Sequence, residues 1–160
     1  MKYRKPVSID EIRSYLHTCG EGTKLYFGCD SERFRVDGVW HNDFMLVLVI
    51  HREGQHGCKI FGEVQRERDF DSKPSKPSYR LMSEAYRLAE FYHRLEDLLI
   101  EFDFDYELHL DINSDEKAGS NIVLNQAIGY IKGTCNVIPM YKPNAFAASY
   151  ASDRLKYLRG

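Results

Sequence analysis

Hydrophobic positions along the chain follow two different periodicities, and each predicts a different kind of element. From 78 to 102 the apolar residues recur at steps of three and four, which is typical of a long helix with one apolar face. Elsewhere apolar residues cluster or alternate over the length of a strand, which favours β-structure. The segments of this second kind are 24–30, 44–50, 59–65, 106–112 and 136–140.

The order of these segments predicts the fold. The first three strands follow one another through turn-like residues, so we expect an antiparallel meander. The later strands alternate with helices, and such crossovers join parallel strands. The helices are predicted at 78–102, 121–131 and 146–158. The sequence therefore predicts one α/β domain over 1–160, with a mixed five-stranded sheet and helices on both faces. Within it, 1–22 form a helical N-terminal extension that begins with a capping-box pattern at Ser8.

Charge and composition narrow the class of protein. The chain of 160 residues has 22 Lys and Arg against 24 Asp and Glu, a net charge of −2. Proteins that bind the nucleic-acid backbone unaided usually carry a positive excess, so we expect any nucleic-acid contact to use a local basic patch or bound cations. No apolar segment reaches the roughly 20 residues needed to cross a membrane, and the cysteines form no C-x-x-C pair. We expect a soluble, cytoplasmic protein with free, mostly packed thiols and no membrane partner.

Four carboxylates fall where the predicted topology brings chain segments together. Asp30 and Asp111 end the first and fourth predicted strands, which run parallel, so both lie at one edge of the sheet. Glu84 lies in the first turns of the long helix, on the flank of its apolar stripe, and this helix begins at the same edge. Asp153 lies on the sheet-facing flank of the last helix. A single aspartate at a strand end is more often a turn or cap residue, so the weight comes from the coincidence of several positions.

Carboxylates held close together repel one another and need a counter-charge. Hard oxygen ligands suit Mg²⁺ or Mn²⁺, which also bind phosphate groups. Two such ions about 3.5–4 Å apart activate a water and stabilise the leaving oxygen in phosphodiester hydrolysis. The acidic set therefore predicts a two-metal site that accepts an anionic substrate.

Several sequence motifs resemble those of one family. They are Tyr26-Phe-Gly-Cys-Asp-Ser31, Arg80-Leu-Met-Ser-Glu-Ala-Tyr86, His109-Leu-Asp-Ile112 and Tyr141-Lys-Pro-Asn-Ala-Phe-Ala-Ala-Ser149, the last followed by Asp153. In order and spacing they are similar to the YkuK family of predicted ribonuclease H-like proteins. The residues before Asp153 depart from the Ala-Asp-Lys pattern towards which that family tends.

The resemblance implies a ribonuclease H-like fold with a D-E-D-D acidic set that binds two Mg²⁺ or Mn²⁺ ions. Carried over position by position, this set is Asp30, Glu84, Asp111 and Asp153. The resemblance also implies hydrolysis of nucleic acid that leaves 5′-phosphate and 3′-hydroxyl ends.

Further residues are candidates for substrate binding, each with a structural alternative. Ser31 either bonds the substrate or caps a turn. His109 either orients a carboxylate or a water, or is a hydrogen-bonded core residue. Lys142 either contacts a phosphate, neutralises the acids, or is an ordinary surface lysine. Arg80 ends a basic run that either contacts nucleic acid or is a solvated loop. The run consists of Arg66, Arg68, Lys73, Lys76 and Arg80.

The leading hypothesis is a metal-dependent nuclease. The motifs of P-loop ATPases, dinucleotide-binding domains and serine hydrolases are absent from the sequence, so no nucleotide cofactor is expected. One alternative is a non-catalytic module of the same fold that binds nucleic acid or protein, which the negative net charge favours. Another is a junction resolvase, a chemistry that also occurs on this fold.

Overall fold

The described strands and helices follow one another in the order that the sequence predicts. The computed structural model describes residues 5–52, 58–69, 78–113 and 118–142. Within these ranges the elements are α1 (Ile9–Leu16), β1 (Lys24–Val36), β2 (Val39–His51), β3 (Lys59–Arg68), α2 (Ser78–Phe102), β4 (Asp105–Asn113), α3 (Ala118–Cys135) and β5 (Met140–Lys142). The long helix α2 has the predicted bounds, because its apolar stripe continues from end to end. The last predicted helix, 146–158, lies outside the described residues.

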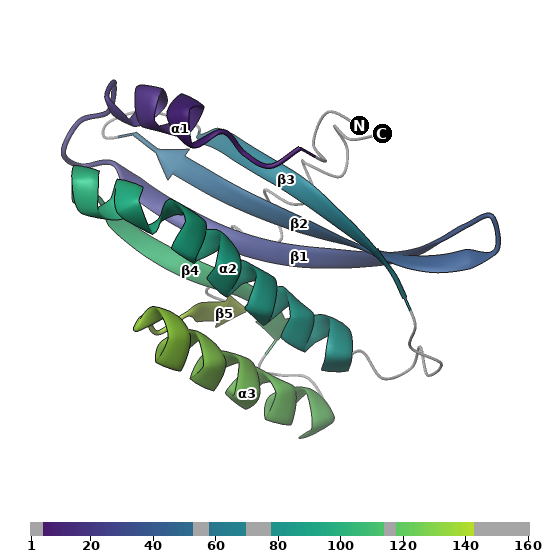
Figure 1. Cartoon of the computed structure of the whole chain (residues 1–160). Helices are drawn as coiled ribbons and strands as arrows, with labels where there is room; N and C mark the ends of the chain where they lie inside the picture. The colour runs from purple at the N-terminus through teal and green to yellow at the C-terminus, as the bar shows by residue number, and fades with distance from the viewer. Residues whose placement is uncertain (1–4, 53–57, 70–77, 114–117, 143–160) are drawn as a thin grey trace.

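The five strands form one mixed sheet in the order β3-β2-β1-β4-β5 (Figure 1). β1 pairs antiparallel with β2, and β2 with β3, which confirms the predicted meander. β4 pairs parallel with β1, and β5 pairs parallel with β4, as helical crossovers require. β1 and β4 therefore run side by side in the same direction, toward the same edge of the sheet.

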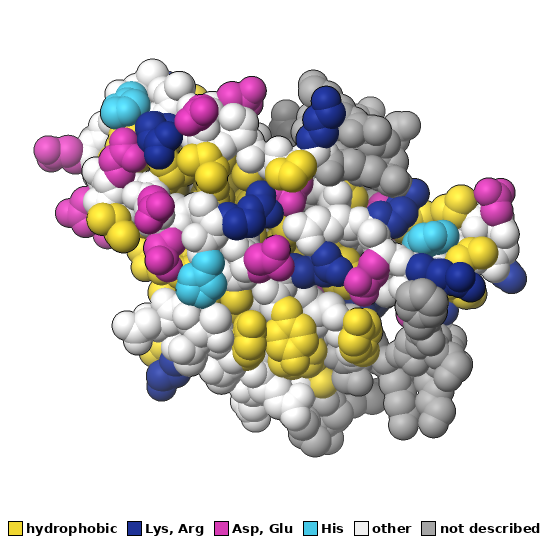
Figure 2. Space-filling view, viewed as in Figure 1, with side chains coloured by type: hydrophobic (Ala, Val, Ile, Leu, Met, Phe, Trp, Pro, Cys, Tyr) yellow, Lys and Arg dark blue, Asp and Glu magenta, His cyan; other side chains and the backbone are white. Residues whose placement is uncertain are grey.

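The main core lies between the sheet and the described helices. Alternate residues of β1 and β4 enter it, and the apolar stripe of α2 packs on the same face. Its buried members include Phe27, Cys29, Leu88, Leu95, Leu108 and Leu110. A second cluster lies on the opposite face of the sheet, because successive side chains of β2 point to opposite faces. It consists of Met45, Val47, Val49 and Val64. Charged side chains of both signs are spread over the helical face (Figure 2).

β1 is longer than predicted, and this changes the setting of Asp30. The sequence predicts a strand that ends at Asp30, where the apolar run stops, but β1 continues through polar residues to Val36. This continuation pairs with β2, whereas the pairing with β4 ends at Cys29. Asp30 therefore lies where the sheet loses a strand, and the rest of the β1–β2 hairpin projects beyond the core (Figure 1).

A two-residue turn closes this hairpin at the predicted place. Asp37 and Gly38 connect the strands with φ values of 50° and 78°. Positive φ at both positions is what a type I′ turn requires, and this turn matches the twist of the paired strands. Glycine takes this conformation at no steric cost, and aspartate is among the side chains that tolerate it.

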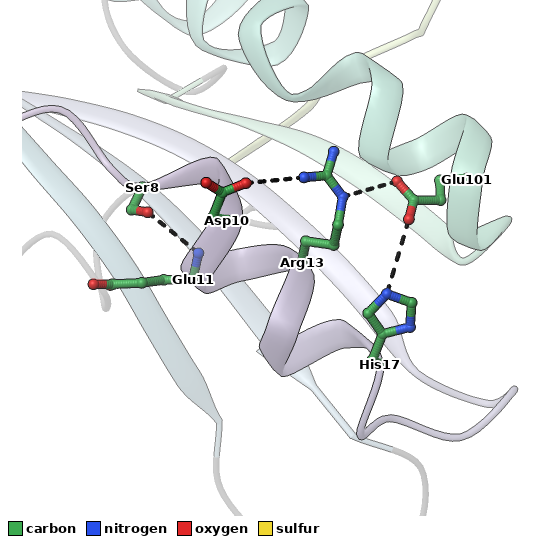
Figure 3. Close-up of polar contacts among 6 residues, drawn as sticks. All are labelled: Ser8, Asp10, Glu11, Arg13, His17 and Glu101. Carbon is green, nitrogen blue, oxygen red and sulfur yellow. Dashed lines mark hydrogen bonds and ion pairs between the residues drawn. The ribbon is translucent and has the colours of Figure 1, made fainter.

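Helix α1 is held at its start by a cap and on its side by α2 (Figure 3). The Ser8 hydroxyl accepts a hydrogen bond of 3.2 Å from the Glu11 N–H, so Ser8 is the N-cap that the sequence predicts. Arg13 forms an ion pair of 3.1 Å with Glu101 near the end of α2. The apolar side of α1 joins the main core, so this helix packs on the same face as α2.

The segment after α3 differs from the prediction. Helix α3 extends to Cys135, and Asn136 ends it with a φ of 56°. Residues 137–139 are not part of a strand, and β5 covers Met140–Lys142. The strand predicted at 136–140 was therefore placed too early.

Two expectations from composition concern the state of the cysteines and the absence of a membrane-spanning segment. Cys19, Cys29, Cys58 and Cys135 are free; Cys29 and Cys135 are buried, and Cys58 is exposed. Within the described ranges, no helix is both long and apolar enough to cross a membrane.

Candidate active site

Asp30 and Asp111 occupy neighbouring backbone positions where β4 leaves β1. The last registered pair of these parallel strands is Cys29 and Leu110, and each aspartate is the next residue along its strand. Paired strands lie about 4.7–4.9 Å apart. The pairing of β4 with β5 shifts register between Leu110 and Asn113, and such irregularities re-aim side chains and are common next to active sites. The backbone thus brings these two predicted residues together.

Glu84 approaches the same edge from α2 and is held by Ser31. Glu84 is only 2% exposed, and its Oε1 accepts a hydrogen bond of 2.5 Å from Ser31 Oγ. Ser31 is registered with Phe44, a core residue of the α2 face, so strand alternation directs its hydroxyl toward the helix. The other carboxylate oxygen, Oε2, is buried and has no hydrogen-bond partner in the described part of the chain.

The pKa of Glu84 depends on its burial and on the charges of both aspartates. Burial raises the pKa of Glu84 well above its usual range, and the negative charges of Asp30 and Asp111 raise it further. The Ser31 hydroxyl and the Arg80 guanidinium lower the pKa of Glu84 but do not offset these effects. Arg80 lies one helical turn earlier, on the same side of α2. The negative charges of both aspartates therefore act on Glu84, with only partial compensation from Ser31 and Arg80.

Two other buried acids show how this protein neutralises a carboxylate in its interior. Asp43 accepts two hydrogen bonds from Arg66, at 2.7 and 3.0 Å. Glu63 accepts two from Arg94, at 3.1 and 2.5 Å. Such forked pairs offset much of the desolvation of both partners. Glu84 is as buried as Glu63, but a hydroxyl stands where the other acids have a guanidinium. A buried carboxylate with weak compensation is typical of a functional site.

The predicted four-carboxylate metal site is not assembled by the described residues alone. In the ranges that the structure describes, no three His, Cys, Asp or Glu side chains are arranged to hold a metal ion. Asp153, the fourth predicted ligand, lies outside these ranges. The chemistry of the donors nevertheless fits a hard cation, because all are carboxylate oxygens and Oε2 of Glu84 is buried with no described hydrogen-bond partner.

His109 lies in the interior of the protein. It is fully buried, its ring meets that of Tyr26 edge-on at 5.4 Å, and its Nε2 lies 2.9 Å from Oε2 of Glu107. Burial lowers the pKa of His109 despite the opposing charge of Glu107. A fully buried ring offers no surface to a substrate, so this arrangement favours the core alternative for His109 over substrate binding.

The basic residues predicted to contact a substrate have different surroundings. Lys142 ends β5, beside the carboxyl end of β4. Arg66 is paired with the fully buried Asp43, so it serves the interior rather than a nucleic-acid surface. Two further members of the basic run, Lys73 and Lys76, lie outside the described residues.

Sequence reasoning missed a group of residues on the projecting hairpin. The Arg33 guanidinium lies 3.8 Å from the centre of the Trp40 ring and pairs with Asp69 at 2.5 Å. Arg35 lies opposite Trp40 in the register of β1 and β2. The available signal was two arginines at alternate positions near the single tryptophan. This signal becomes informative only when the pairing of β1 with β2 is known, and the apolar pattern predicts that β1 ends before these arginines.

The fold is that of an α/β protein in which two parallel strands carry Asp30 and Asp111 to one edge of the sheet, and the helix packed on the sheet carries Glu84 toward this acidic edge. One family model, described as Ribonuclease H-like, matches residues 8–156. The match spans most of the chain, so the protein belongs to this ribonuclease H-like family, and the resemblance to the YkuK family is confirmed. Comparisons with curated proteins and with solved structures give no match. Membership of the family indicates, at a coarse level, a nuclease-type hydrolase that acts on nucleic acid.

Proposed function

We propose that this protein is a metal-dependent nuclease that hydrolyses phosphodiester bonds at the edge where β4 leaves β1. The observation that supports the proposal is that three acids lie near one edge of the sheet. Asp30 and Asp111 occupy neighbouring positions on parallel strands, and Glu84 lies within electrostatic reach of both. Membership of a ribonuclease H-like family supports the same chemistry.

In this proposal Asp30, Glu84 and Asp111 hold Mg²⁺ or Mn²⁺ through their carboxylate oxygens, with Asp153 as the fourth ligand. When bound, two such ions supply a water nucleophile at neutral pH and stabilise charge on the leaving oxygen. The part of the protein is to keep the carboxylates ionised and oriented. Ser31 does this for Glu84, because its hydrogen bond to Oε1 favours the charged form.

Arg80 provides the counter-charge on the helix side of the site. Arg80 lies one helical turn before Glu84 and lowers the pKa of that carboxyl, and its side chain is only half-buried, so the guanidinium can also reach a substrate phosphate. Its Nε has no hydrogen-bond partner among the described residues. We assign Arg80 to the phosphate next to the cleaved bond, with Lys142 as a second candidate. Hydrolysis leaves 5′-phosphate and 3′-hydroxyl ends.

The direct test is cleavage of hybrid, double-stranded and branched substrates by the purified protein with Mn²⁺ or Mg²⁺. Asp30→Asn and Asp111→Asn preserve the side-chain shape, remove a charge, and should lower the rate about 100-fold or more. Asp97→Asn, at an exposed position of α2, is the matched control and should cleave like the parent. If the two site variants, purified free of host nucleases, cut as well as the parent, the proposal is wrong.

Metal binding has a readout of its own. Calorimetric titration with Mn²⁺ should give a binding signal in the parent that Glu84→Gln weakens about 10-fold or more. Glu90→Gln, an exposed position on the same helix, should leave the signal unchanged. Equal Mn²⁺ affinity in the parent and in Glu84→Gln would remove Glu84 from the ligand set.

A non-catalytic binding module of the same fold is the second candidate. One observation favours it: the described residues provide no ready group of three metal ligands. This candidate predicts tight nucleic-acid binding that EDTA does not weaken, with no cleavage products. Metal-dependent cleavage would exclude it, and a preference for four-way junctions by a stable dimer would instead indicate a resolvase.

A further inference from the structure

The β1–β2 hairpin carries aromatic and basic side chains that the proposed cleavage chemistry does not use. It projects because β1 and β2 stay paired as far as Val36 and Val39, whereas the pairing of β1 with β4 ends at Cys29 (Figure 1). Hydrophobic, basic, histidine and acidic side chains lie at this end of the molecule (Figure 2). Trp40, the largest of the hydrophobic residues on the hairpin, is 37% exposed.

Trp40 is held by neighbouring side chains, among them Arg33 and Arg35, whose guanidinium groups lie by its ring, and it remains partly exposed. The guanidinium of Arg33 lies 3.8 Å from its ring centre, and Arg33 is fixed in turn by its ion pair with Asp69. The Asp69 N–H also donates a hydrogen bond of 2.8 Å to the Trp40 carbonyl. A ring ordered in advance loses less side-chain entropy on binding than a mobile one. Trp40 is therefore suited to stack against a ligand.

One face of β1 leads from this ring to the acidic edge. Residues two apart on a strand share a face, so Ser31, Arg33 and Arg35 point to the same side. At one end Ser31 contacts Glu84, and at the other Arg35 lies opposite Trp40. Each two-residue step covers about 6.6 Å, which is close to the spacing of successive phosphates along an extended nucleic-acid strand.

We propose that this face of the hairpin binds the single strand of nucleic acid that leaves the cleavage site, with Arg35 on a phosphate and Trp40 against an unpaired base. This proposal rests on the proposed function, because the strand bound by the hairpin is the continuation of the substrate that is cleaved at the acidic edge. Arg35 is exposed, and the ion pairs among the described residues do not include it. A cation beside an open aromatic ring is the combination by which proteins bind single strands without sequence preference.

Asp37, two residues beyond Arg35, provides an internal control. It is exposed at the turn with a φ of 50°, a conformation that asparagine adopts as readily. Asp37→Asn removes a negative charge from the hairpin tip without straining the turn. Arg35→Gln removes a positive charge from an exposed strand position. A nucleic-acid contact therefore predicts opposite effects of these two changes on affinity, which a purely structural role of the hairpin does not.

Trp40 is the single tryptophan of the chain, so tryptophan fluorescence, excited at wavelengths where the 11 tyrosines do not absorb, reports on the hairpin. We would titrate the full-length protein in Mg²⁺ with a single-stranded phosphorothioate oligonucleotide, which resists cleavage with this metal. The fluorescence should be quenched on binding. Affinity should fall about 3–10-fold in Arg35→Gln and rise in Asp37→Asn. The slope of log K against log salt should become shallower by about 0.7 in Arg35→Gln, as expected for the loss of one phosphate contact.

Failure of this inference can be told apart from failure of the proposed function. Unchanged Trp40 fluorescence at saturating oligonucleotide, or equal affinity of the parent, Arg35→Gln and Asp37→Asn, would overturn the hairpin contact even if cleavage is observed. Quenching by a blunt duplex but not by a single strand would overturn it as well. Quenching with the expected order of affinities, but no cleavage with any metal, would support the hairpin contact and reject the nuclease.

Discussion

Ser31 on β1 and Glu84 on α2 are joined by a hydrogen bond of 2.5 Å, although they lie 53 residues apart in the sequence. The bond ties the beginning of the long helix to the strand that carries Asp30. It holds one oxygen of a buried carboxylate that the charges of Asp30 and Asp111 make harder to ionise. Ser31 thus controls the charge state of Glu84 from a position that need not touch substrate or metal.

Removing this hydroxyl should shift the pH dependence of metal binding. In Ser31→Ala the charged form of Glu84 loses a hydrogen bond, so the pKa of Glu84 rises further. Because a metal ligand must be deprotonated, half-saturation with Mn²⁺ should move to higher pH, and affinity at pH 7 should fall about 10-fold. Calorimetry across a pH series measures both. Ser31→Thr keeps the hydroxyl and should restore the profile; an unshifted profile in Ser31→Ala contradicts the assigned role.

Glu84→Gln should make the metal-free protein more stable at high pH. The pKa of Glu84 is raised above 4.5 by burial and by Asp30 and Asp111, so the folded state binds its proton more tightly than the unfolded state. The resulting stability is present below pH 4.5 and is lost as the pH rises through the folded value. A glutamine is neutral at every pH and can still accept the Ser31 hydrogen bond, so it avoids this loss.

The measurement is thermal unfolding in EDTA over a pH series. At pH 8 the free energy of unfolding of Glu84→Gln should exceed that of the parent by about 1–3 kcal/mol, and the difference should vanish toward acid pH. The exposed control, Glu90→Gln, should follow the parent at every pH. A parent that is as stable as Glu84→Gln at pH 8 would show that the buried carboxylate carries no such penalty.

Much of the fold could be predicted because its signals are local. The stripe of α2 is continuous, and the bounds of this helix follow from it. The far half of β1 could not be predicted, since Ser31 to Val36 has no sustained apolar pattern and forms a strand only because β2 pairs with it. The strand predicted at 136–140 failed for the opposite reason. Residues 137–139 are apolar but pair with no described strand, only Met140 belongs to β5, and Asn136 takes a conformation that ends α3.

Of the candidate site, the backbone positions could be predicted and the side-chain contacts could not. Parallel strands end at one edge, so topology alone brings Asp30 near Asp111. The bond from Ser31 to Glu84 and the burial of His109 depend on which face each side chain takes and what covers it. The spacing of the residues along the sequence predicts neither of these features. The place of Asp153 in the site stays a prediction.

The ion pair of Glu63 with Arg94 fixes β3 to α2 and should contribute strongly to stability. Burial raises the pKa of Glu63, but hydrogen bonds from Arg94, Gln65 and the Val7 N–H outweigh it, and the net pKa is lowered. This stabilisation is therefore present above pH 4.5 and is lost as the pH falls through the lowered folded value. Glu63→Gln leaves Arg94 without its counter-charge and should lower the free energy of unfolding by about 2–4 kcal/mol at pH 7.

Urea unfolding at pH 7 and at pH 4 tests this contribution. The loss in Glu63→Gln should shrink at the lower pH, where the parent itself begins to lose the pair. Glu67→Gln removes a carboxylate from a more exposed ion pair on the same strand and should lower the free energy of unfolding by less than about 1 kcal/mol. Equal effects of the two substitutions would mean that burial does not distinguish the pairs.

Two glycines should respond to the same substitution with opposite signs. Gly38 has a φ of 78° in the hairpin turn, and an added Cβ would meet nothing within 4 Å. Gly38→Ala should therefore lower the free energy of unfolding by about 1–2 kcal/mol, through the backbone conformation alone. Gly129 lies in α3, where an added Cβ is equally unobstructed, and Gly129→Ala should raise the free energy of unfolding by about 0.5–1 kcal/mol. Urea unfolding with an unchanged m-value measures both. A neutral Gly38→Ala would show that the hairpin turn does not need a left-handed residue, and so would contradict the type I′ turn on which the register of β1 and β2 rests.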